Sequence, residues 1–148
     1  MNPFLLDPKE RLKAWKGLRA QIASTESVVE QMDLALNFWK QAPLEKPILD
    51  WDNCQSWPTP WEMLHTNRFC ESTLSLAVGY SLVLSSPHNY PDLELVLITD
   101  RLNHVQKVLA RTQEWTLNHS WLDRLPRYQL QNVQIHSKWH YNGKAWQE

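Results

Sequence analysis

The sequence predicts an α+β fold in which N-terminal helices pack on a C-terminal antiparallel sheet. Apolar residues recur at helical spacing through the first half of the chain, and short apolar runs separated by polar turns follow in the second half. Helices first and strands afterwards are typical of the α+β class. The chain has 148 residues, the usual size of one domain, so we expect a single domain over residues 1–148.

Residues 1–42 are expected to form a helical pair. Asp7 followed by Pro8 predicts the first helix start, because an acidic N-cap and a proline at the first helical position both favour it. Ser24 or Thr25 is the expected cap of the second helix. The sequence has 9 Trp, and we expect the indoles on these helical faces to be core residues, since each buries a large area.

Residues 43–66 predict a connection rich in Pro and Trp that ends in a short helix. Thr59 and Glu62 stand three positions apart, the capping-box spacing that marks a helix start. Residues 67–86 predict a largely buried central helix, broken by the Ser-Ser-Pro sequence at residues 85–87.

Residues 92–141 predict the antiparallel sheet. Three strand candidates, residues 93–98, 104–110 and 115–118, are joined by short polar connections. Short connections favour an antiparallel meander. Residues 130–141 are expected to add one or two further strands.

The composition excludes several classes of protein. The 15 basic and 16 acidic residues nearly cancel, so we expect no nucleic acid as a partner. No apolar run approaches the ~20 residues that span a bilayer, and the first residues lack the basic region of a signal peptide, so we expect no membrane partner and a cytoplasmic protein. Cys54 and Cys70 are then expected as reduced thiols, although the sequence leaves their pairing open.

Three residues carry the candidate chemistry: Cys70, His104 and Asn118. Cys70 lies at the start of the predicted central helix, where the partial positive charge of a helix N-terminus stabilises a thiolate. A thiol on a helix, facing an imidazole on a sheet that an amide orients, is the papain-type arrangement. The simpler interpretation is a buried apolar thiol and a solvated histidine. His65 and His119 stay open as alternative bases.

We expect no cofactor and no metal site. His136 and His140 offer two metal ligands at a spacing of four, but no matching Cys, His or Asp cluster accompanies them. The sequence has neither a Gly-rich phosphate loop nor the G-x-S-x-G turn of serine hydrolases.

The segment around Cys70 resembles the bacterial transglutaminase-like cysteine peptidases, which have a papain-like fold. In that family a W-x-T-P-x-E-x-L segment leads into G-D-C-E-D at the catalytic helix; here WPTPWEML at residues 57–64 leads into RFCES at residues 68–72. His104 with the residue after it resembles the start of the family's H-A-V-L strand, and WTLN at residues 115–118 its W-V-L-D-N strand. The resemblance covers about residues 30–122 and implies Cys70, His104 and Asn118 as the triad.

Some residues around Cys70 differ from the family pattern, and they bear on two expected functions. Arg68 and Phe69 replace the Gly-Asp before the cysteine, and Ser72 replaces the Asp after it. The first expectation is therefore a structural or assembly protein on a degenerate peptidase fold, with other protein chains or further copies as partners. The WPTPWE segment also resembles bacteriophage-encoded proteins, which implies a virion or tail component. The alternative is an active cysteine peptidase or acyl-transferase with Cys70 as the nucleophile.

Overall fold

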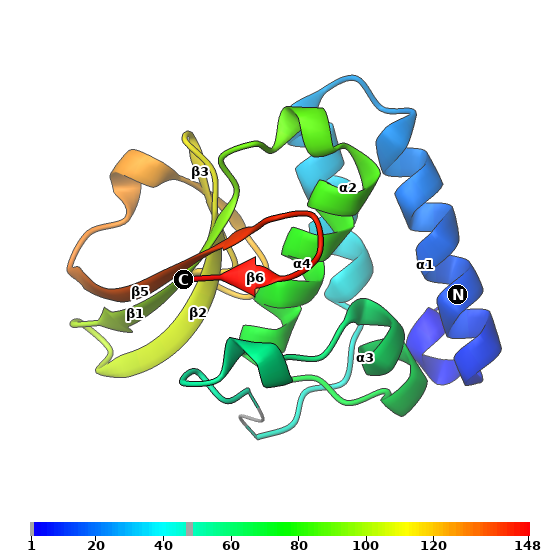
Figure 1. Cartoon of the computed structure of the whole chain (residues 1–148), viewed down its shortest axis with the longest axis horizontal. Helices are drawn as coiled ribbons and strands as arrows, with labels where there is room; N and C mark the ends of the chain where they lie inside the picture. The colour runs from blue at the N-terminus through cyan, green and yellow to red at the C-terminus, as the bar shows by residue number, and fades with distance from the viewer. Residues whose placement is uncertain (1, 47–48) are drawn as a thin grey trace.

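A computed structural model describes residues 2–46 and 49–148; Met1 lies outside them, as do Pro47 and Ile48 of the predicted connection. Figure 1 shows helices gathered on one side of a twisted sheet. The helices are α1 (Pro8–Ala23), α2 (Val28–Trp39), α3 (Pro60–Thr66) and α4 (Glu71–Ser85). The strands are β1 (Glu94–Asp100), β2 (Val105–Arg111), β3 (Trp115–Leu117), β4 (Arg124–Pro126), β5 (Val133–Tyr141) and β6 (Trp146–Gln147). The predicted α+β fold is confirmed.

Local capping chemistry starts the helices. The Asp7 side chain accepts a hydrogen bond from the Glu10 N–H at the start of α1, and Thr59 forms the predicted capping box of α3. The predicted cap of α2 is wrong: Ser27 caps that helix, while Ser24 ends α1 because its N–H still bonds back into the last turn.

Helix α4 is the centre of the molecule, and nearly all of its side chains are buried. On its helical side, Ser81 Oγ accepts hydrogen bonds from the indole N–H groups of Trp15 and Trp39, each at 3.0 Å. On its sheet side, Ser72 and Ser75 bond to the backbone of β2. The helix therefore joins the helical pair to the sheet.

In the part of the chain that the structure describes, the sheet has six strands in the order β4-β3-β2-β1-β5-β6. Strands β1 to β4 form the predicted antiparallel meander, and β5 returns to the far side of β1. A register shift opposite Leu97 and Ile98 leaves His136 as an extra residue in β5. Strand β4 is an element that the sequence did not predict.

Most of the core lies between the helices and the sheet. Trp15 and Trp39 are 0% exposed, which confirms the core interpretation for the indoles of the helical pair. Trp139 on β5 is 1% exposed, whereas Trp61 and Trp121 are 46% and 42% exposed. A smaller apolar cluster covers the opposite face of the sheet, built from Val96, Ile98 and Leu109 with Leu130 and Val133 packed against it. Within the described part of the chain, the helices are too short or too polar to cross a membrane.

Candidate functional site

Cys70 is the N-cap residue of α4 and is 2% exposed. Its backbone is held by Thr73, whose hydroxyl accepts from the Cys70 N–H at 2.8 Å and donates to the Cys70 carbonyl at 3.0 Å. The first N–H groups of a buried helix are close to the thiol, and they bring partial positive charge. Cys70 and Cys54 are both free thiols.

A depression of about 280 Å³ opens beside Cys70. The connection before α3 supplies Leu44 and Trp51 to its wall, and β2 supplies Val105. Leu44 and Val105 are each 45% exposed, so the rim is partly apolar and faces solvent. The depression is large enough for a few side chains of another molecule rather than for an extended ligand.

The polar residues that line this depression are Glu45, Glu71, Gln106 and Lys107. Glu45 pairs with Arg68 at 2.9 Å. Lys107 Nζ is a donor to the carbonyl of His119. Among the lining residues that the structure describes there is a thiol but no imidazole.

Gln106 lies on β2 and lines the depression together with its neighbours Val105 and Lys107; its side chain is exposed. The Val108 N–H donates to Ser72 Oγ at 3.2 Å and the Val108 carbonyl accepts from Ser75 Oγ at 2.6 Å, which fixes β2 along the first turns of the helix. The Gln106 amide also donates to Thr99 Oγ1 at 3.4 Å. No local pattern singles out Gln106, because its place at the depression depends on the register of β2 against α4.

His104 lies in the turn between β1 and β2, with an exposed side chain and a φ of 56°. The prediction that it starts the strand is wrong, since β2 begins at Val105. The Asp100 side chain causes the tight turn: its oxygens accept from the N–H groups of Leu102 and Asn103. His104 does not line the depression beside Cys70. Its proposed role as a base stays a prediction.

Asn118 is 4% exposed and has a φ of 71°, one residue beyond the end of β3 at Leu117. The prediction that it ends the strand is therefore wrong by one residue. Its Nδ2 donates to the Glu71 carbonyl and to Ser75 Oγ, both at 2.8 Å, and its Oδ1 accepts from the Leu122 N–H at 2.8 Å. Both amide N–H groups thus tie the β3–β4 turn to α4, and the role of Asn118 in a triad stays a prediction.

The alternative bases lie elsewhere. His119 Nε2 is 3.8 Å from Asp100 Oδ2, and its side chain lines a different depression, between α2 and the turn after β3. Burial, together with the nearby Lys107 ammonium, holds the pKa of His119 below its ordinary value. The Asn103 side-chain amide, with the backbone N–H groups of the turn, lowers the pKa of Asp100. His65 is exposed at the end of α3.

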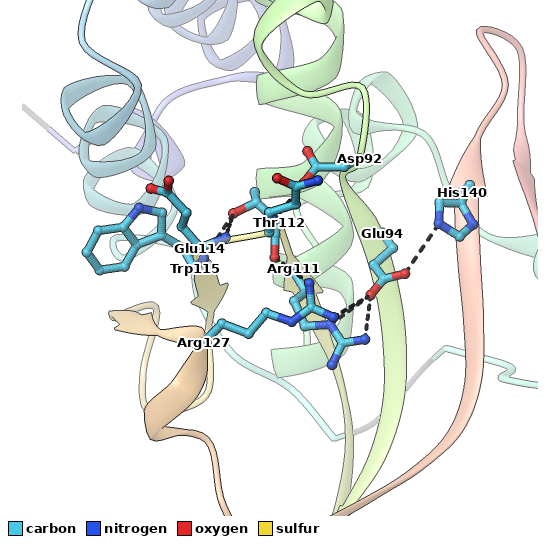
Figure 2. A network of polar contacts seen from close by, with 9 residues as sticks. Asp92, Glu94, Arg111, Thr112, Glu114, Trp115, Arg127 and His140 are labelled. Atoms are coloured by element: carbon cyan, nitrogen blue, oxygen red, sulfur yellow. Dashed lines mark hydrogen bonds and ion pairs between the residues drawn. The ribbon is translucent and has the colours of Figure 1, made fainter.

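A second polar cluster lies on the sheet face away from α4 (Figure 2). Glu94 on β1 is 8% exposed. Its Oε1 accepts a hydrogen bond from Arg111 Nε at 2.7 Å and lies 3.7 Å from Arg127. Its Oε2 lies 3.3 Å from His140 Nε2. A buried carboxylate needs such partners, because an isolated one is costly to desolvate. The cluster joins β1, β2 and β5 and holds no nucleophile.

The two predicted metal-ligand candidates are engaged separately. His136 Nε2 is 2.6 Å from Thr99 Oγ1, and His140 pairs with Glu94. Over residues 2–46 and 49–148, no group of three or more His, Cys, Asp or Glu side chains is placed to hold a metal ion.

Solved structures of LapG from Legionella pneumophila share this fold. The calcium-bound structure has a TM-score of 0.72 and 13% sequence identity, and the match covers 95% of this chain and 79% of LapG. A second LapG structure and an EGTA-treated one each have a TM-score of 0.68 and 13% identity, over 86% of this chain and 71% of LapG. No protein-family model and no curated protein sequence matches the chain. The fold is transglutaminase-like.

Proposed function

We propose that this chain is a non-catalytic binding and assembly domain built on a transglutaminase-like fold. One observation supports the proposal above others: the depression beside Cys70 is lined by Gln106, while His104 stands exposed in the preceding turn. An amide does not accept a proton from a thiol at neutral pH, so Gln106 does not replace the general base of a cysteine peptidase.

The surroundings of Cys70 support the same proposal. Asn118 uses both amide N–H groups to bond to α4, and its Oδ1 already accepts from the Leu122 N–H within the turn. A thiol without a base is weakly nucleophilic at neutral pH.

Exposed apolar side chains support a role in contacts with other protein chains. Leu44 and Val105 flank the depression, and Leu102 in the β1–β2 turn is 71% exposed. Apolar groups that remain in solvent at one end of a sheet favour contact with another protein surface. We infer that a partner chain, or another copy in an assembly, covers this end.

Alkylation of Cys70 tests the proposal. In a Cys54→Ser background, iodoacetamide labels Cys70 alone, and the labelling rate is measured by mass spectrometry from about pH 5 to 9. A slow rate that rises only above about pH 8, and that is unchanged in His104→Ala, supports a non-catalytic domain. Fast labelling near pH 6 that is lost in His104→Ala would overturn it.

The second candidate function is an active cysteine peptidase or acyl-transferase. The place of Cys70 at the N-terminus of a buried helix favours it, as does the fold shared with LapG, a cysteine protease. In this function Cys70 attacks an amide carbonyl, His104 carries the proton, Asn118 orients His104, and backbone N–H groups at the start of α4 stabilise the oxyanion. It requires the β1–β2 turn to move so that His104 reaches Cys70.

The setting that we propose for the assembly role is a bacteriophage particle. Its support is the WPTPWE segment at residues 57–62, which resembles phage-encoded proteins. The protein would be made in the cytoplasm and incorporated into the virion or tail. Immunogold labelling of purified particles with an antibody against this chain tests the setting, and particles that carry no label count against it.

A further inference from the structure

Strand β5 has one open edge. Its inner edge is paired with β1 throughout, but β6 pairs with it only at His140 and Tyr141 (Figure 1). Among residues 2–46 and 49–148, no other strand and no loop forms a hydrogen bond to the backbone of residues 133–138 from the open side. An edge of this length accepts an added strand through main-chain hydrogen bonds.

The register shows which backbone groups face outward. The N–H and carbonyl of Val108 bond to serines of α4, so they point away from β1. Hydrogen-bonded and non-hydrogen-bonded residue pairs alternate along an antiparallel pair of strands. Leu97 is the partner of Val108, so its N–H and carbonyl point towards β5. The N–H and carbonyl of the neighbouring Val96 point towards β2. Lys138 is the β5 partner of Val96, so its N–H and carbonyl face the open edge.

The charge of this edge is one-sided. Strand β5 carries His136, Lys138 and His140 and no acidic residue. Lys138 is exposed and makes no ion pair with any residue that the structure describes. Beyond residue 123, the acidic residues reduce to Glu148, against four basic ones, Arg124, Arg127, Lys138 and Lys144. Arg124 and Arg127 are paired with Asp33 and Glu94, so the positive charge that stays without a carboxylate partner on β5 itself, among the described residues, is that of Lys138.

We propose that the open edge of β5 binds an extended, acidic segment of a partner protein as an added strand beside β6. Main-chain hydrogen bonds at Lys138 and its neighbours would hold the segment, and its carboxylates would face Lys138. A second copy of this chain is a poorer fit at the same edge, because its own β5 carries no carboxylate that could face Lys138. The edge is separate from the Cys70 depression, since β1 and β2 lie between them.

Fluorescence anisotropy with the intact protein tests this proposal. The probe is a fluorescein-labelled peptide of alternating Glu and Val, about eight residues long and blocked at both ends; the matched probe replaces Glu by Lys. Saturable binding of the acidic probe alone, weakened by added salt, supports the proposal. Equal binding of the two probes, or binding of neither, overturns it.

Lys138→Glu locates the site. It should weaken binding of the acidic probe about tenfold, whereas Lys16→Glu, the same charge change on the exposed face of α1, should leave it unchanged. Hydrogen exchange of the wild-type protein supplies a readout that needs no variant: the acidic probe should protect the Lys138 amide. Protection elsewhere only, equal effects of the two variants, or a dimer of the protein alone that protects the same amide would overturn the proposal.

Discussion

Replacing Asn118 by aspartate separates a structural role of this residue from a catalytic one. Asn118 Nδ2 donates two hydrogen bonds into α4, to the Glu71 carbonyl and to Ser75 Oγ, both at 2.8 Å. A carboxylate has no N–H to donate and would face the Glu71 carbonyl with negative charge. If Asn118 only orients an imidazole, aspartate serves as well, because a carboxylate orients the histidine in triads of this kind.

The expected loss follows from these contacts. Two buried hydrogen bonds disappear, and the Glu71 carbonyl keeps no donor from this side chain, so Asn118→Asp should lower the free energy of unfolding by about 2–4 kcal/mol. That is a large share of the roughly 5–15 kcal/mol that stabilises a typical domain. The loss should shrink near pH 4, since a protonated carboxyl can donate one hydrogen bond again.

Urea unfolding followed by circular dichroism at pH 7 measures this loss. Asn132→Asp is the matched control: Asn132 has a φ of 59° and is exposed, so the same change there should alter stability by less than about 0.5 kcal/mol. A loss below about 1 kcal/mol for Asn118→Asp, combined with faster alkylation of Cys70, would refute the structural role.

Three further predictions concern the core, the site and the pH dependence. Ser81→Ala leaves two buried indole N–H groups without their acceptor and should lower the free energy of unfolding in urea by about 2–4 kcal/mol. Ser85→Ala should lower it by less than about 0.5 kcal/mol, because the Ser85 hydroxyl has no hydrogen-bond partner among the described residues. Gln106→His places an imidazole beside Cys70 and should speed its alkylation at pH 7 about tenfold; an unchanged rate would show that the side chain at this position does not reach the thiol. Burial holds the pKa of His119 below its ordinary value, so the unfolded chain binds the proton at a higher pH than the folded one. The free energy of unfolding should therefore fall as the pH is lowered from about 7 to 5. In His119→Gln the urea midpoint should lose the share of this fall that His119 causes.

Helix starts were predictable where the capping chemistry is local. Asp7 and Thr59 each accept a hydrogen bond from an N–H only three residues away, so the signal lies within one turn of sequence. The cap of α2 was missed because Ser24, Thr25 and Ser27 all fit the local pattern. The choice among them depends on how far α1 continues before its C-cap.

Strand ends were the weak point of the sequence prediction. His104 and Asn118 were each predicted to lie within a strand, and each lies one residue outside the observed strand with a positive φ. The alternation of side chains between two faces ends with the strand. The strand pattern therefore does not predict where these two side chains point.

Periodicity and capping act over a few neighbouring residues, so local patterns were enough to predict the helix-first α+β order and the place of Cys70 at the start of a buried helix. The place of Gln106 in the depression beside that thiol depends instead on the register of β2 along α4. Ser75 donates a hydrogen bond to the Val108 carbonyl and Ser72 accepts one from the Val108 N–H, which joins residues 33 and 36 positions apart. No local pattern encodes contacts at that separation.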